Sequence, residues 1–197
     1  MPDAIDSLIL NGREERNLEY KQTMNWSNAA TKAKLVKSCI AMANLRDGGT
    51  IVLGIERQPD DTYAPLGMEA DDYESFNQDG VSTEVNNYAD PFVELSVMRR
   101  ELDGKRFVII KLQEFQELPI VCKRDGEKLR AGAIYIRPRR KIETVEVPSQ
   151  VDMRELLDLA IEKRVRILYG QIERMGAKLT FAKDPNSEAF DNQLGDL

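Results

Sequence analysis

The chain contains no histidine and only two cysteines, and these absences narrow its chemistry. Without histidine, nucleophilic catalysis by serine–histidine or cysteine–histidine pairs is excluded, and so is zinc held by imidazole. Cys39 lies in a helical pattern and Cys122 in a strand pattern, so we expect reduced core thiols rather than a disulfide framework. Catalysis by this chain would therefore rest on carboxylates, lysines, tyrosines or a metal ion held by oxygen ligands.

Long hydrophobic runs are also missing. No stretch reaches the roughly 18 consecutive apolar residues of a membrane helix, and the N-terminal sequence M-P-D-A-I-D lacks the basic and then apolar layout of a secretory signal. We therefore expect a cytoplasmic protein without a membrane partner. The formal net charge of −6 argues against a uniformly basic nucleic-acid binder, although a net value hides local patches.

The composition is that of a folded protein. The 197 residues are 42% hydrophobic and 31% charged, which fits one ordinary domain with extensions. We predict three parts: a domain over residues 1–148, a helix over 149–179 that packs or mediates oligomerisation, and a flexible polar tail over 180–197.

Hydrophobic periodicity predicts the central elements. Partial alternation over residues 17–23 indicates a strand, helical spacing indicates a helix over 31–44, and the nearly continuous apolar run over 50–55 indicates a strand covered on both faces. Between the last two lies Gly48-Gly49. Because this pair follows a helix and precedes a strand, it is typical of a helix end and a tight turn, not of a phosphate cradle.

The remaining pattern predicts two hairpins and further helix. One hairpin joins residues 92–99 and 106–112 around Asp103-Gly104, and the other joins 120–123 and 133–137 around Asp125-Gly126. A weak helix is expected over 82–88, and an apolar stripe beginning at Leu156 and Leu157 indicates one long helix after Pro148. The sequence thus predicts an α/β (α+β) fold, with a mixed, largely antiparallel sheet, packed helices and a long C-terminal helix.

Three motifs carry a family resemblance. They are E-E-R-N-L-E-Y-K from Glu14 to Lys21, A-M-A-N-L-R-D-G-G-T-I-V-L-G-I-E from Ala41 to Glu56, and G-A-I-Y-I-R from Gly132 to Arg137. Together they resemble the Schlafen-type AlbA domain, described as a DNA-binding domain of bacterial regulators and found as the core of animal Schlafen proteins. The resemblance covers about residues 5–145 and implies a nucleic-acid partner. Glu15 departs from it, because serine is common at that place.

The carboxylates of Glu14, Glu19 and Glu56 form a candidate metal site. Magnesium and manganese take oxygen ligands, and a bound ion can activate water and stabilise charge on a phosphodiester. The resemblance implies an acidic triad at these places in some nucleolytic Schlafens, which makes the three glutamates candidate ligands of Mg²⁺ or Mn²⁺ in an endoribonuclease, with Lys21 stabilising the phosphate charge. The alternative is structural: Glu19 pairs with a nearby cation, and Glu14 is a solvated turn residue.

Basic residues gather in the second predicted hairpin and after it. The candidate nucleic-acid contacts are Arg124, Lys128, Arg130, Arg137, Arg139, Arg140 and Lys141. Along one edge of a hairpin they would contact several phosphates without reading bases, which leaves DNA and RNA as alternatives. The other interpretation is a solvated charged face. Trp26, beside polar neighbours, is expected to be exposed and able to stack on a base.

Three functions are therefore compared. The leading one is nucleic-acid binding through phosphate contacts, with a regulatory role. The second is the metal-dependent endoribonuclease built on the glutamate triad. The third is a structural or regulatory homo-oligomer formed through the helix over 149–179.

Overall fold

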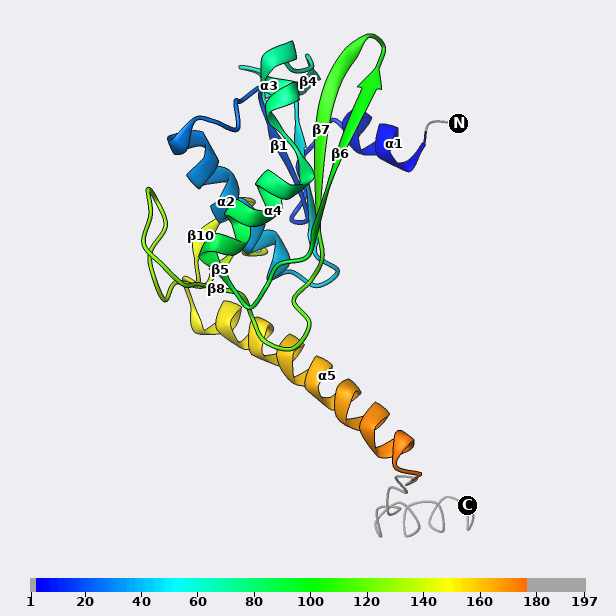
Figure 1. Ribbon diagram of the computed structural model, residues 1–197, viewed down its shortest axis with the longest axis vertical. Helices are drawn as coiled ribbons and strands as arrows, with labels where there is room; N and C mark the ends of the chain where they lie inside the picture. Colours follow the sequence, from blue (N-terminus) through cyan, green and yellow to red (C-terminus); the bar gives the residue numbers. More distant parts are fainter. Residues whose placement is uncertain (1–2, 177–197) are drawn as a thin grey trace, which may run out of the picture. The chain divides into compact units, whose positions relative to one another are not determined.

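A four-stranded sheet occupies the centre of the computed structural model, which describes residues 3–176 (Figure 1). The strand order is β1 (Leu18–Lys21), β2 (Gly49–Leu53), β7 (Lys105–Leu112) and β6 (Leu95–Leu102). Strands β1 and β2 are parallel, whereas β2 with β7 and β7 with β6 are antiparallel. The fold is therefore α+β with a mixed, largely antiparallel sheet, as the sequence predicts.

Alternate side chains of the central strands pack into two hydrophobic clusters, one on each face of the sheet. On β2, Ile51 and Leu53 face one cluster and Val52 faces the other, and β7 divides its side chains in the same way. Helices α2 (Ala29–Ala43) and α4 (Gln78–Tyr88) cover the first face, and α1 (Ala4–Leu10) covers the second through Ile9 (Figure 1). The apolar run over 50–55 is thus buried on both faces, as predicted.

Short ladders and helices complete the domain. Strand β3 (Ile55–Arg57) pairs with β4 (Tyr63–Pro65), β5 (Ala89–Asp90) with β8 (Val121–Cys122), and β9 (Tyr135–Ile136) with β10 (Val145–Glu146). Helix α3 (Ala70–Ser75) lies between β4 and α4 in the sequence. The first predicted hairpin is confirmed as β6–β7. The second is wrong as a strand pair, because β8 and β9 take partners elsewhere in the chain and only a few main-chain hydrogen bonds near Cys122 and Ala133 join the two segments.

The long C-terminal helix, α5, runs from Gln150 to Arg174. The chain divides into two compact units at Ile161, so the first half of α5 belongs to the unit that contains the sheet. There, Leu156 and Leu159 are buried, whereas Leu157 is 49% exposed. The expected apolar stripe therefore contributes fewer core residues than predicted. The predicted tail over 180–197 lies outside the described residues.

No helix within residues 3–176 combines the length and apolarity needed to cross a membrane.

A glutamine covers part of the outer edge of the sheet. Strand β6 is an edge strand, and the Gln78 side chain donates to the carbonyl oxygen of Leu95 at 3.0 Å and accepts from the amide of Val97 at 2.7 Å. Further along, the Arg99 guanidinium donates to the carbonyl oxygens of Glu74 and Phe76. These bonds attach the loop before α4, and the start of α4, to the edge of the sheet.

The glycine pair between α2 and β2 is structural. Gly48 has a φ of +71°, and a Cβ placed there would lie 2.1 Å from the carbonyl oxygen of Leu112 on β7. At Gly49 a Cβ would lie 2.3 Å from the sulfur of buried Met42. Gly48 therefore requires a close approach to the β7 backbone that only glycine allows, whereas Gly49 leaves room for the buried Met42 side chain.

Replacing Gly48 by alanine should destabilise the domain by roughly 3 kcal/mol or more, because backbone strain and a main-chain clash combine. The matched control is Gly104→Ala in the β6–β7 turn, where φ is +72° and no atom lies within 4 Å of the added Cβ. The Gly104→Ala variant should lose only the stability that backbone strain costs, about 1 kcal/mol. Urea unfolding of both variants measures the difference, and equal losses would contradict the packing argument.

Candidate functional site

A buried ion pair joins two of the motifs. Glu19 on β1 is 4% exposed and Arg137, just after β9, is 1% exposed. The Arg137 guanidinium donates to Glu19 Oε2 at 2.7 Å. The other carboxylate oxygen accepts from Ser38 Oγ on α2 at 3.0 Å and contacts Lys21 Nζ. Both oxygens of Glu19 are therefore engaged by donors of this chain.

Arg137 and Arg16 bind each other's main chain. Arg137 Nε donates to the carbonyl oxygen of Arg16 at 2.9 Å, and Arg16 Nε donates to the carbonyl oxygen of Arg137 at 2.7 Å. Arg16 also donates to Glu155 on α5 at 2.7 Å. Burial alone would raise the pKa of Glu155, but the hydrogen bonds from Arg16 and Arg139 outweigh it and hold this pKa below its ordinary value of 4.5.

Glu14 is held by two donors at the free edge of β1. Its Oε1 accepts from the Tyr20 amide at 2.8 Å, and its Oε2 accepts from the Tyr63 hydroxyl at 3.1 Å. Burial and the adjacent Glu14 charge raise the pKa of Tyr63, so its phenol stays protonated and continues to donate. Glu14 is thus a fixed structural acceptor rather than a solvated turn residue.

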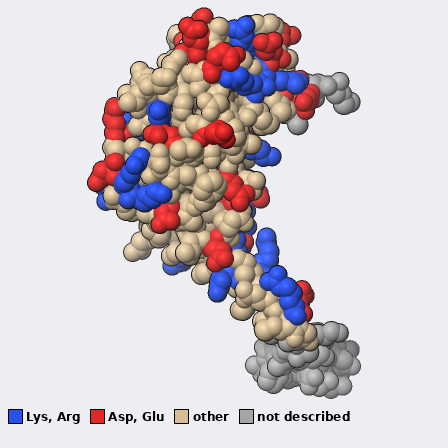
Figure 2. All heavy atoms as spheres, viewed as in Figure 1, with Lys and Arg blue, Asp and Glu red and all other residues tan. Residues whose placement is uncertain are grey.

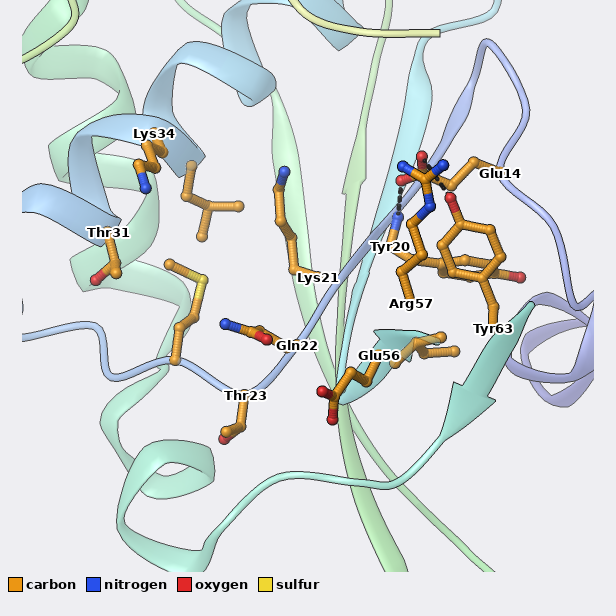
Figure 3. A pocket seen from close by; sticks show the side chains of 13 residues that line it. Glu14, Tyr20, Lys21, Gln22, Thr23, Thr31, Lys34, Glu56, Arg57 and Tyr63 are labelled. Carbon is orange, nitrogen blue, oxygen red and sulfur yellow. Dashed lines mark hydrogen bonds between the residues drawn. The ribbon is translucent and has the colours of Figure 1, made fainter. Parts of the chain in front are cut away.

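The three candidate metal ligands do not converge. Glu56 is exposed on β3 and lies at the other end of a cavity from Glu14 (Figure 3). Glu19 is enclosed by its own partners. Within residues 3–176, no group of three or more aspartate, glutamate, histidine or cysteine side chains is arranged to hold a metal ion. The structure therefore does not bring the three predicted ligands together, and Glu19 is bound to Arg137 instead.

Two adjoining cavities lie beside these residues. The first, about 420 Å³, lies between the end of β1, the start of α2 and β3 (Figure 3). The second, about 340 Å³, extends toward the turn around Lys128. They share Glu14, Lys21 and Lys34 as lining residues, so they form one continuous depression. We call it the lysine groove, after Lys21, Lys34, Lys37 and Lys128.

The lysines of the groove come from three separate segments. Lys21 ends β1, Lys34 and Lys37 lie one turn apart on α2, and Lys128 lies in a tight turn closed by two hydrogen bonds between Gly126 and Leu129. Lys37 Nζ lies 4.8 Å from the centre of the Tyr135 ring. Tyr135 also accepts from the amide of Arg130 at 2.8 Å. One tyrosine therefore positions both Lys37 and the turn that carries Lys128.

The predicted basic hairpin is only partly available. Arg137 is wrong as a phosphate contact, because it is buried against Glu19. Arg124 lies over the Tyr88 ring at 4.2 Å, and Arg140 is exposed. The other three, apart from Lys128, have carboxylate partners: Arg130 with Glu146, Arg139 with Glu155, and Lys141 with Glu143. Of the predicted set, Lys128 and the buried Arg137 line the groove, and only Lys128 is exposed there.

One expectation about side-chain exposure is also wrong. Trp26 is 7% exposed and packs on Phe76 with ring centres 5.5 Å apart, so its prediction as an exposed stacking residue is wrong.

Lys34 and Lys37 are not among the site residues predicted from the sequence. The available signal was their spacing of three on the outward face of a helix, which places them one turn apart.

The fold and the groove define an α+β domain closed by a buried glutamate–arginine pair beside a cluster of lysines. The chain belongs to the family described as Schlafen, AlbA_2, whose profile matches residues 14–146. This match confirms the resemblance seen in the three motifs.

Individual relatives are distant. The chain is 25% identical over 152 residues to an uncharacterized ATP-binding protein of Ureaplasma parvum serovar 3, covering 70% of this chain and 41% of that protein. It is similar to the crystal structure of the DIP2311 protein of Corynebacterium diphtheriae, with 16% sequence identity and a TM-score of 0.48. The match covers 73% of this chain and 25% of that one. It is also similar to the N-terminal domain of a RecG-related protein of Nitrosomonas europaea, with 19% sequence identity and a TM-score of 0.39. That match covers 66% of this chain and 89% of that domain. The chain thus spans less than half of the curated relative.

Breaking the buried pair should strongly destabilise the domain rather than only alter a surface site. Glu19→Gln and Arg137→Met should each cost about 3–5 kcal/mol, because each leaves a buried partner uncompensated. The double variant should cost clearly less than the sum. Urea unfolding of the four proteins measures the coupling. Additive losses, or Glu19→Gln with parental stability, would contradict a structural role.

Acid should weaken the contact between α5 and Arg16. Because the folded-state pKa of Glu155 is depressed, its contribution to stability is present above pH 4.5 and is lost as pH falls through the folded value. Glu155→Gln should therefore be less stable than the parent at neutral pH and should lose less stability between pH 5 and 3. Thermal melting across this range tests the prediction, and parallel pH profiles would oppose it.

Proposed function

We propose that this chain binds nucleic acid through phosphate contacts in the lysine groove. The observation that carries the proposal is the convergence of four lysines from three segments on two adjoining cavities. Membership of the Schlafen AlbA_2 family supports it, because that family is associated with nucleic acids. Lysine ammonium groups act as compact point charges and contact phosphates without reading bases.

The charge of the groove is local. Basic and acidic side chains are interspersed on the face seen in Figure 2, and the formal net charge is −6. Binding by general attraction to the whole protein is therefore disfavoured. Among the described residues, Lys34, Lys37 and Lys128 have no carboxylate within ion-pair distance, which distinguishes them from Arg130 and Arg139. Their charges are available to a ligand.

Binding is better supported than metal-dependent RNA cleavage. Glu14 and Glu56 line the first cavity together with Lys21, but the third carboxylate of the expected triad belongs to the core. Within residues 3–176 the carboxylates are not arranged as a site for Mg²⁺ or Mn²⁺. The ATP-binding description of the Ureaplasma relative is not transferred either, since the chain spans 41% of that protein.

Removing the free lysines should reduce the salt dependence of binding more than removing the cluster that the sequence suggests. In Lys34→Ala/Lys37→Ala/Lys128→Ala, the slope of log K against log salt should fall by roughly 2–3, about 0.7–0.9 for each lost phosphate contact. Fluorescence anisotropy with labelled single-stranded and duplex DNA and RNA, at several salt concentrations, gives the slope.

The matched control removes the same charge elsewhere. Arg139→Ala/Arg140→Ala/Lys141→Ala should change the slope by less than half as much, because two of these side chains already have carboxylate partners. If the control triple variant changes the slope more than the lysine triple variant does, the binding site lies on the segment after β9 instead. Absence of binding at low salt in the parent would overturn the proposed function.

A further inference from the structure

The second cavity carries a surplus of positive charge in a confined space. Its lining includes five cationic side chains, Lys21, Lys34, Lys37, Lys128 and Arg137, and three anionic ones, Glu14, Glu19 and Glu143. The surplus is two positive charges in about 340 Å³. This volume is at the lower end of small-ligand sites, which span about 300–1,000 Å³.

The anionic side chains of this cavity are engaged by other groups. Glu19 accepts from Arg137 and Ser38, Glu14 accepts from Tyr20 and Tyr63, and Glu143 pairs with Lys141 at 2.6 Å. The lysines Lys34, Lys37 and Lys128 have no such partner among the described residues. The surplus charge therefore resides on three ammonium groups that can turn toward a ligand.

A hydroxyl group in the wall of the cavity also lacks a partner. Thr144 Oγ1 is buried and has no hydrogen bond within the described part of the chain. A buried polar group left in this state costs about 1–3 kcal/mol. An anionic oxygen that accepts from this hydroxyl would remove part of that cost.

The first cavity has a different character. It shares Glu14, Lys21 and Lys34 with the second cavity and adds one cation, Arg57, and one carboxylate, the exposed Glu56. Its uncharged polar lining includes Gln22, Thr23 and Thr31. The added Arg57 is paired with Asp61, so this cavity has a smaller surplus of positive charge than the second, and its amide and hydroxyl groups suit a sugar and a base. The two adjoining cavities thus match the two parts of one phosphorylated nucleotide.

We infer that the groove recognises the phosphorylated end of a nucleic-acid strand, with the terminal phosphomonoester in the second cavity and its nucleoside in the first. This inference rests on the proposed function and refines its substrate class. A phosphomonoester carries nearly two negative charges at pH 7, whereas a backbone diester carries one, so the surplus of two matches the terminal group. The chemistry is shared by 5′-phosphate and 3′-phosphate ends.

The test compares oligonucleotides that differ only at their ends. One sequence of single-stranded DNA, and the same sequence as RNA, is prepared with a 5′-phosphate, with a 3′-phosphate or with hydroxyls at both ends. An internal fluorophore leaves both ends free for anisotropy. The parent should bind one phosphorylated form about tenfold or more tightly than the hydroxyl form. Whichever of the 5′-phosphate and 3′-phosphate forms binds more tightly identifies the strand end that the groove recognises. Equal affinities for all three forms would overturn the inference while leaving the proposed function intact.

Variants then locate the preference. Lys128 is exposed on a turn, so Lys128→Gln leaves the core untouched, and Lys37→Gln keeps the aliphatic stem. Each should reduce the preference for the phosphorylated end several-fold more than it reduces affinity for the hydroxyl form. Lys111→Gln, an exposed lysine on β7 that lines neither cavity, should change neither. A preference that persists in both Lys37→Gln and Lys128→Gln would exclude the second cavity as its source.

Discussion

The buried contact between Glu19 and Arg137 is the constraint on which this domain depends. An arginine that is 1% exposed is strongly unfavourable unless a carboxylate neutralises it and its remaining donors are satisfied. Here Glu19 provides the charge, and the carbonyl oxygens of Glu15 and Arg16 accept the other hydrogen bonds. The partners are 118 residues apart in the sequence. The pair therefore joins the first strand of the sheet to the segment that follows β9.

This commitment also decides the chemistry at the surface. Glu19 neutralises Arg137 and contacts Lys21, so both of its oxygens already interact with cationic side chains of this chain. Within residues 3–176, Lys34, Lys37 and Lys128 have no equivalent partner, so the groove retains positive charge in an acidic protein. Strand β1 thus carries both the structural anion Glu19 and, on the same face, Lys21 of the groove, so loss of the first would disrupt the second.

The sequence was most informative where local pattern decides structure. The helix over α2, the strand β2 and the β6–β7 hairpin follow from periodicity and from the Asp103-Gly104 turn. The pairing of the short strands was not readable, because β8 and β9 are two residues each and β8 pairs with the distant β5 rather than with β9. Within the run Arg137, Pro138, Arg139, Arg140, Lys141, nothing local marks Arg137 as the buried one. That distinction requires knowing that Glu19 lies opposite it.

The hydrogen bonds of Gln78 and Glu14 have a consequence for how copies of this domain behave together. An open sheet presents unpaired main-chain groups along its two outer strands, and such strands recruit strands from other molecules. On β6 the Gln78 amide occupies the groups of Leu95 and Val97, and on β1 the Glu14 carboxylate occupies the amide of Tyr20. Strand addition at either border must first displace a side chain that is already bonded, which protects the domain against cross-β aggregation.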